Sequence, residues 1–218
     1  MKRPSKHIAL VALAVACALA GFLASETRFL STLELKTLDL RFRLLGNQGV
    51  ASPDIVLVAI DDASLKTLEP AVGRWPWPRD AHSVLLGYLE RAGARLVVFD
   101  LLFLERDIQN PEGDTAFGDA TEQAGNVVHS IHLGAQQISD APTDLLTSVS
   151  LPSVGDFDTF AGADLPLEPI ARGAKGLGHV AMALDRDGPW RRYLLLADHN
   201  ARLLPSLALS SALSSEGS

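Results

Sequence analysis

The chain has 218 residues and a formal net charge of −7, and its acidic side chains all lie after the N-terminal segment. An acidic body of this kind argues against a nucleic-acid partner, because phosphate binding needs a basic patch. The hydrophobic fraction of 47%, with 21% charged residues, excludes a disordered chain and a collagen-like or coiled-coil array. We therefore expect one compact domain with a small appendage.

The N-terminus joins a basic segment, residues 1–7, to 17 uncharged residues, Ile8–Ala24. We interpret 8–24 as a transmembrane anchor with residues 1–7 in the cytoplasm, which places the acidic body on the extracytoplasmic side of the cell membrane. A cleaved signal peptide ending near Ala20 and a buried helix of a soluble core are the alternatives. The single cysteine, Cys17, lies in this run, so one chain forms no disulfide and no cysteine-based zinc site.

Leucine and phenylalanine residues spaced three and four apart predict a helix over Glu26–Leu45 that ends at Gly46, followed by a linker at 47–53. Downstream, apolar runs and an amphipathic stripe predict alternating strands and helices. The expected elements are a doubly covered strand at Ile55–Ile60, a helix with Pro78 in its first turn and Gly93 at its end, a strand at Leu96–Phe99, a helix at Asp114–Ala124 and a strand at Val127–Leu133. This order predicts a parallel sheet with right-handed crossovers.

The region 134–176 lacks periodicity and is expected to be a long loop. Leu177–Leu184 and Trp190–Ala197 flank Asp185-Arg186-Asp187-Gly188, a turn sequence that suits an antiparallel hairpin at the sheet edge. A helix over Pro205–Leu213 closes the domain. The predicted fold class is three-layer α/β, with a mixed, mostly parallel sheet and flanking helices, preceded by the N-terminal transmembrane helix.

Carboxylates gather where the predicted strands end. Asp61 and Asp62 follow the first strand and Asp100 follows the second. Ligands of open α/β sheets bind outside the carboxyl ends of the strands, and oxygen ligands of this kind suit magnesium or calcium. The alternative is structural: Asp61 or Asp62 caps a short helix, and Asp100 binds loop amides.

The segment Trp75-Pro76-Trp77-Pro78-Arg79 is stiffened by two prolines and carries two indoles. It is either a lid or contact face, or a rigid connection whose rings fill the core. Asp185-x-Asp187-Gly188 resembles the start of a calcium loop but lacks the glutamate at the twelfth position, so a hairpin turn is favoured.

Two further pairs of residues carry side chains of types that bind anions or metal ions. Arg191 and Arg192 suit an anion or surface ion pairs. His129 and His132 face opposite sides of a strand and do not suit one metal ion. The sequence has no nucleophile elbow, phosphate loop or dinucleotide-binding glycine motif, which leaves an enzyme site poorly supported.

The order of motifs resembles the second type of CHASE domain, a sensory module associated with cyclases and histidine kinases. The resemblance runs from about Leu33 to the C-terminus and rests on three segments: Ile60-Asp61-Asp62-Ala63-Ser64-Leu65, Trp75-Pro76-Trp77-Pro78-Arg79 and Phe99-Asp100. It implies an extracytoplasmic ligand-sensing domain of a bacterial transmembrane receptor with a cyclase or kinase output. No second apolar span follows Leu213, so we expect a fragment of a longer receptor or a truncated, stand-alone form.

These observations lead to one organisation and one candidate site. We expect a sensory domain at 26–213 and a short tail at 214–218. The candidate ligand-binding residues are Asp61, Asp62, Trp75, Trp77, Arg79 and Asp100. The sequence predicts no catalytic residue and no cofactor, and a metal ion at this site stays an alternative. The expected partners are an unidentified small molecule and the membrane, with a homodimer as an option. The rival functions are a periplasmic metal-dependent hydrolase that uses Asp61 and Asp100, and a structural dimerisation module.

Overall fold

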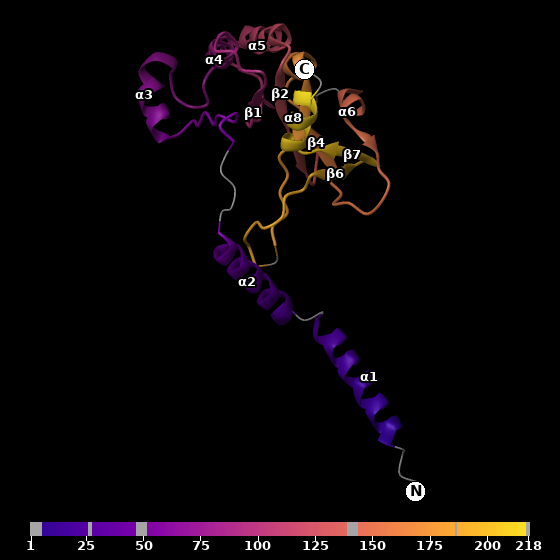
Figure 1. Cartoon of the computed structure of the whole chain (residues 1–218). Helices are drawn as coiled ribbons and strands as arrows, with labels where there is room; N and C mark the ends of the chain where they lie inside the picture. Colours follow the sequence, from indigo (N-terminus) through magenta and orange to yellow (C-terminus); the bar gives the residue numbers. More distant parts are fainter. Residues whose placement is uncertain (1–5, 26–27, 47–51, 139–143, 186, 217–218) are drawn as a thin grey trace. The chain divides into compact units, whose positions relative to one another are not determined.

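The computed structural model describes residues 6–25, 28–46, 52–138, 144–185 and 187–216 (Figure 1). Most of the predicted basic segment and linker, the start of the helix predicted from Glu26, and the end of the predicted tail lie outside these residues. The chain divides into two units. We call Met1–Val58 together with Asp185–Pro189 the N-terminal unit, and Ala59–Leu184 together with Trp190–Ser218 the main unit.

The described residues begin with four helices in succession and continue as a mixture of strands and helices. The helices are α1 (Lys6–Ser25), α2 (Arg28–Leu45), α3 (Asp62–Val72), α4 (Arg79–Arg91), α5 (Pro111–Ala124), α6 (Asp144–Val149), α7 (Glu168–Gly173) and α8 (Leu207–Glu216). The strands are β1 (Val97–Phe99), β2 (Val127–Gly134), β3 (Leu151–Pro152), β4 (Gly162–Asp164), β5 (Gly176–His179), β6 (Leu196–His199) and β7 (Arg202–Pro205). The described part of the loop predicted at 134–176 therefore contains two short helices and two short strands.

The prediction of an N-terminal transmembrane helix is wrong, because none of the helices in the described residues has the length and apolarity that a membrane crossing requires. The predicted residues 8–24 do form a helix, as the larger part of α1, but alanine occupies seven of the 20 positions of α1. The uncharged run is about 26 Å long at about 1.5 Å per residue, which is shorter than a hydrocarbon core of roughly 30 Å.

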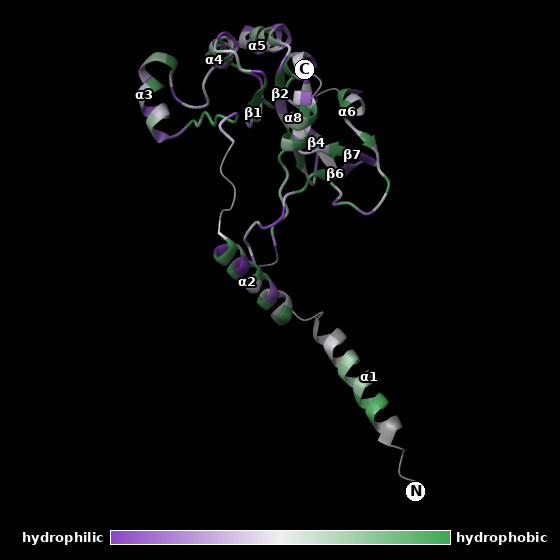
Figure 2. Cartoon of the chain, in the orientation of Figure 1, coloured by the Kyte–Doolittle hydropathy of each residue, from purple (hydrophilic) through white to green (hydrophobic). Residues whose placement is uncertain are grey.

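The strand predicted at Ile55–Ile60 is also wrong. This run is irregular and exposed, with Ile55, Val56 and Leu57 at 78%, 80% and 89% of full exposure. Figure 2 shows it as an apolar stretch that leads into α3. Apolar, β-branched composition favours a strand only where a neighbouring strand completes the hydrogen-bond ladder, and none of the described strands pairs with this run.

The central strand of the main unit is β2, which pairs in parallel with β1 and with β5 and in antiparallel fashion with β4. The parallel pairing of the strands predicted at Leu96–Phe99 and Val127–Leu133 is confirmed. The prediction for the strand from Leu177 is wrong, because β5 lies parallel to β2 instead of forming an antiparallel hairpin with β6. A second, antiparallel sheet has the order β3-β7-β6.

Helices cover both faces of the parallel strands. Leu86 of α4, Phe117 of α5 and Ile170 of α7 pack in one buried cluster with Phe99 and other strand residues. Alternate residues point to opposite faces of a strand, so Val98 and Asp100 lie on the face away from Phe99. On that second face α8 packs over β5 and β2. The predicted α/β class with a mixed sheet is thereby confirmed for the main unit.

Close approach of α8 to the sheet depends on glycine in β5. A Cβ atom at position 178 would lie 2.6 Å from the Leu207 Cα and 2.7 Å from the Ser206 carbonyl oxygen, both backbone atoms. We expect Gly178→Ala to lower the free energy of unfolding by about 1–3 kcal/mol, because α8 must move away from β5. Urea denaturation followed by circular dichroism measures this change.

The matched control is Gly87→Ala in α4, where the new Cβ would approach only the end of the Arg91 side chain, at 3.4 Å. Alanine favours a helix interior over glycine by about 1 kcal/mol, so this variant should be at least as stable as the native chain. A Gly178→Ala chain as stable as Gly87→Ala would show that the packing of α8 on β5 is not tight.

Candidate functional site

A cleft of about 300 Å³ lies between β1 and α8 on the second face of the sheet. Because α8 covers β5 and β2, the outer strand β1 is left partly open there, and Val98 is half-exposed. We call this opening the β1–α8 cleft. Its lining residues are Val98, Asp100, Val180, Met182, Tyr193, Leu207, Ala208 and Ser211.

The polar groups of the β1–α8 cleft are few. Asp100 directly follows β1, so its carboxylate stands at the carboxyl end of a parallel strand. The Ser211 hydroxyl donates to the Leu207 carbonyl oxygen at 2.7 Å within α8, and Tyr193 brings a phenol. A mostly apolar lining with one carboxylate suits a small ligand that has an apolar body and one positive group.

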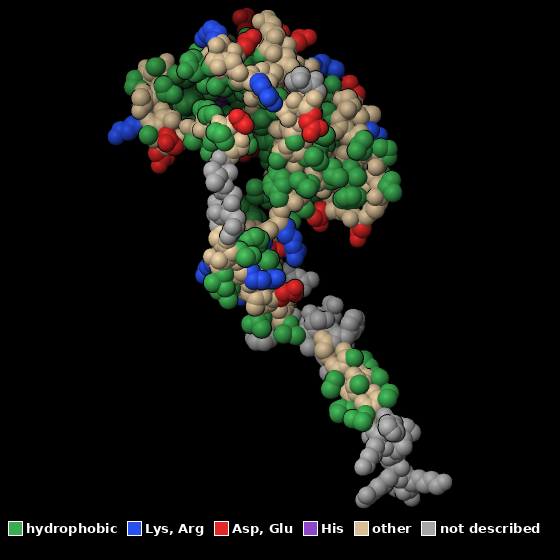
Figure 3. Space-filling view, viewed as in Figure 1, with side chains coloured by type: hydrophobic (Ala, Val, Ile, Leu, Met, Phe, Trp, Pro, Cys, Tyr) green, Lys and Arg blue, Asp and Glu red, His purple; other side chains and the backbone are tan. Residues whose placement is uncertain are grey.

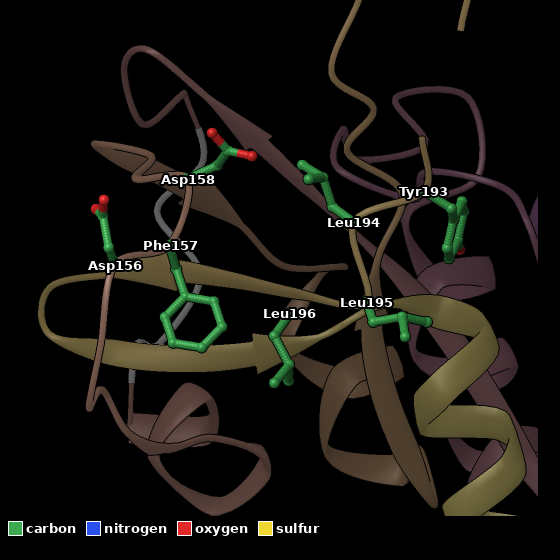
Figure 4. Close-up of a pocket in the computed structure, with 7 residues that line it drawn as sticks. All are labelled: Asp156, Phe157, Asp158, Tyr193, Leu194, Leu195 and Leu196. Carbon is green, nitrogen blue, oxygen red and sulfur yellow. The ribbon is translucent and has the colours of Figure 1, made fainter. Parts of the chain in front are cut away.

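A second cavity of about 420 Å³ lies beside the second sheet (Figure 4). It is lined by Asp156, Phe157, Asp158, Tyr193, Leu194, Leu195 and Leu196. The loop that carries both carboxylates is held along β6, since the Asp198 amide donates to the Asp158 carbonyl oxygen at 2.9 Å. Figure 4 shows the two aspartates at one end of the cavity and Tyr193 at the other. Tyr193 therefore lines both cavities.

Asp61 and Asp62 lie at the start of α3. The Asp61 Oδ1 atom accepts hydrogen bonds from the Ser64 amide at 2.8 Å and the Ser64 hydroxyl at 2.7 Å. These bonds lower the pKa of Asp61, because they favour the ionised carboxylate. The capping interpretation of Asp61 is confirmed, and Asp62 is an exposed residue in the first turn of α3.

The two tryptophans take different positions. Trp77 is buried and Trp75 is half-exposed, and their ring centroids lie 5.5 Å apart in an edge-to-face arrangement. Both rings also approach His82 of α4, at 6.3 Å for Trp75 and 6.5 Å for Trp77. The interpretation that both rings fill the core is confirmed for Trp77, whereas Trp75 keeps an accessible face.

Arg79 is held in a network that the sequence did not reveal. Its Nε atom lies 3.1 Å from Asp114 Oδ1, and its Nη2 atom donates to the Glu105 carbonyl oxygen at 2.6 Å. The guanidinium also lies 4.9 Å from the centre of the Phe103 ring. The first turn of α5 and the loop after β1 are thereby fastened to the start of α4. Asp114 is 35 residues from Arg79, and the one local hint was an acid near the start of a predicted helix.

The remaining sequence motifs have structural partners. His129 is buried and stacks on Phe99 at 5.1 Å, whereas the His132 Nδ1 atom lies 3.0 Å from Asp164 Oδ2. The two histidines thus have separate surroundings, as predicted. The Gly188 amide donates to the Asp185 carbonyl oxygen at 2.9 Å, which confirms the predicted turn. Within the described part of the chain, no group of three His, Cys, Asp or Glu side chains is arranged to hold a metal ion.

The structure brings Asp100 together with residues that sequence reasoning missed. Val180, Met182 and Tyr193 come from the connection between β5 and β6, and Leu207, Ala208 and Ser211 from α8. The sequence feature that could have indicated the residues between β5 and β6 was the apolar composition on both sides of the Asp185–Gly188 turn. On the face seen in Figure 3, apolar side chains gather in patches between scattered charged ones.

Comparison with known proteins gives one match. The family model of the CHASE2 domain matches residues 10–217. This range covers nearly the whole chain and includes every residue that lines the two cavities. No curated protein and no solved structure gives a significant match.

Proposed function

Because the chain belongs to the CHASE2 domain family, a family of extracellular sensory domains of signalling receptors, we propose that it senses a small cationic ligand in the β1–α8 cleft. The observation that carries this proposal is the position of the Asp100 carboxylate, at the carboxyl end of β1 and within a mostly apolar cleft. Ligands of α/β sheets bind at this end of the strands. A volume of about 300 Å³ lies at the lower end of the range of small-molecule sites.

Sensing requires that the ligand favour one of two arrangements of the protein, since a ligand shifts an equilibrium only by its difference in affinity for the two states. We propose that the two arrangements differ at α2 and that the signal reaches a nucleotide cyclase or protein kinase elsewhere in the receptor. Ligand contacts of Asp61, Asp62, Trp75, Trp77 and Arg79 stay predictions, as does a homodimer. The contacts described for Asp61, Trp77 and Arg79 stabilise the fold.

The Asp100 carboxylate can be tested with a matched pair of probes, n-hexylammonium and 1-hexanol, which share an apolar body and differ in charge. Asp100→Asn should weaken n-hexylammonium binding about five-fold, because an ion pair at an accessible site contributes up to about 1 kcal/mol. Binding of 1-hexanol should not change. Titrations of the 218-residue chain followed by NMR measure both affinities.

The control variant is Asp156→Asn, which removes a carboxylate from the second cavity and leaves the β1–α8 cleft intact. It should bind n-hexylammonium as the native chain does. Equal affinity of the native chain for the two probes, or an equal loss in both variants, would contradict the proposed role of Asp100.

A further inference from the structure

The connection from β5 to β6, Val180–Leu195, forms a two-legged arm. Its legs are Val180–Leu184 and Trp190–Leu195, and its turn is closed by the bond from the Gly188 amide to Asp185. The base of each leg is fixed to a different sheet. The Val180 amide donates to the Ile131 carbonyl oxygen of β2 at 3.2 Å, and the Leu195 carbonyl oxygen accepts from the Ser206 amide, just after β7, at 2.8 Å.

Both legs of the arm line the β1–α8 cleft. The first leg supplies Val180 and Met182, and the second leg supplies Tyr193. Met182 and Tyr193 are half-exposed, so part of their apolar surface is free to be covered. Tyr193, Leu194 and Leu195 of the second leg also line the second cavity (Figure 4). A molecule that fills the cleft therefore meets both legs at once.

The turn of the arm belongs with α2 instead of with the legs. Asp185–Pro189 groups with the N-terminal unit, whereas both legs belong to the main unit. Asp187 Oδ2 lies 3.9 Å from the Lys36 Nζ atom of α2. The Asp187 side chain is only 11% exposed. One continuous segment thus contacts the cleft at its legs and α2 at its turn.

We infer that the arm transmits occupancy of the β1–α8 cleft to α2. The inference rests on the proposed function in taking this cleft as the ligand site. The described residues of the two legs form no regular ladder, and several of their apolar side chains are exposed. Segments with few buried contacts have low local stability and are the parts of a protein that rearrange. A ligand that covers Met182 and Tyr193 orders the legs, and the turn carries this ordering to α2.

The test fills the cleft by mutation and needs no ligand. Ala208 lines the cleft and is exposed, so Ala208→Phe places a ring where the ligand is expected. Hydrogen exchange measured by mass spectrometry on the 218-residue chain reports on α2 and on the two legs. We expect exchange to slow at least three-fold in the legs and in α2. The matched control is Ala212→Phe, an exposed position of α8 that does not line the cleft, which should leave both regions unchanged.

A second variant tests whether the turn transmits the effect from the legs to α2. Lys36→Met removes the ion pair between α2 and the turn. In the Ala208→Phe/Lys36→Met chain, the legs should still be slowed, and α2 should exchange as in Lys36→Met alone. Unchanged exchange of α2 in Ala208→Phe, or slowing of α2 that persists in the double variant, overturns the inference. Failure of the n-hexylammonium titration would instead reject the ligand proposal, and the result for the arm would be independent of it.

Discussion

Replacing Arg79 with methionine is expected to lower the free energy of unfolding by about 3–5 kcal/mol, because it leaves a buried carboxylate without its cation. The side chains of Arg79 and Asp114 are 11% and 9% exposed. Asp114 Oδ2 also accepts a hydrogen bond from the Asp107 amide at 3.0 Å, so the same carboxylate holds the loop before α5. Loss of the guanidinium therefore weakens the contact between α4, α5 and that loop. Urea denaturation measures the change.

A comparison with an exposed ion pair isolates the effect of burial. Arg74 lies 2.9 Å from Glu69, and both side chains are exposed, so Arg74→Met should cost less than about 1 kcal/mol. Replacing Asp114 with leucine in the Arg79→Met chain removes the orphaned charge and should recover part of the loss. An Arg79→Met chain as stable as Arg74→Met would show that the buried pair does not hold these elements together.

The parts of the fold that the sequence predicts are those set by local pattern. The amphipathic stripe of α4, the apolar run of β2 and the periodicity of α2 each require only neighbours in the chain. The pairing of β5 with β2 was not predicted, because a turn between two apolar runs looks the same whether or not its flanks pair. The strand prediction for Ile55–Ile60 was wrong for a related reason. The composition of this run suits a strand, but a strand forms only where a neighbouring strand pairs with it.

Of the residues that line the candidate site, the sequence indicated only Asp100, because only this prediction depends on local order along the chain. Asp100 was identified by the rule that ligands bind at the carboxyl ends of parallel strands, which requires only the order of elements. The rest of the cleft depends on how closely α8 lies on β5, and this is set by backbone contacts at Gly178. Tyr193 and Met182 carry no motif. The Arg79–Asp114 pair joins two helices, and a single sequence does not indicate which of several acids an arginine will meet.

Acidification is the second change for which a large loss of stability is expected. His82, His129 and His179 are buried in the main unit. Burial lowers the pKa of His82 to about 4, with a smaller contribution from the Arg79 charge, and that of His129 to about 3, with a contribution from His82. Burial alone lowers the pKa of His179 to about 4. His129 Nδ1 and His179 Nε2 are buried without a hydrogen-bond partner, so a proton on either nitrogen would remain unpaired.

The stability of the main unit should fall on acidification, because the unfolded chain binds more protons than the folded chain. In the unfolded chain these histidines take up protons near pH 6.5, whereas in the folded chain they stay neutral until about pH 4 or below. Between these values the unfolded state binds more protons, so stability is complete above pH 6.5 and falls as the pH drops. A pKa lowered from 6.5 to about 4 corresponds to about 3 kcal/mol per histidine at the bottom of this window. Since domains are stable by about 5–15 kcal/mol, protonation of two or three buried histidines should unfold the main unit near pH 4.

Urea denaturation at constant ionic strength between pH 7.5 and 4.5 measures this profile. His82→Phe removes one titrating group and keeps a ring against Phe103, whose centroid lies 5.2 Å from that of His82, so its profile should be shallower. The control Phe117→Leu disturbs the same aromatic cluster without removing a proton site, and it should lower stability by a similar amount at every pH. A native profile that is flat between pH 6.5 and 4.5, or a His82→Phe profile as steep as the native one, would mean that burial of these rings does not set the response to acid.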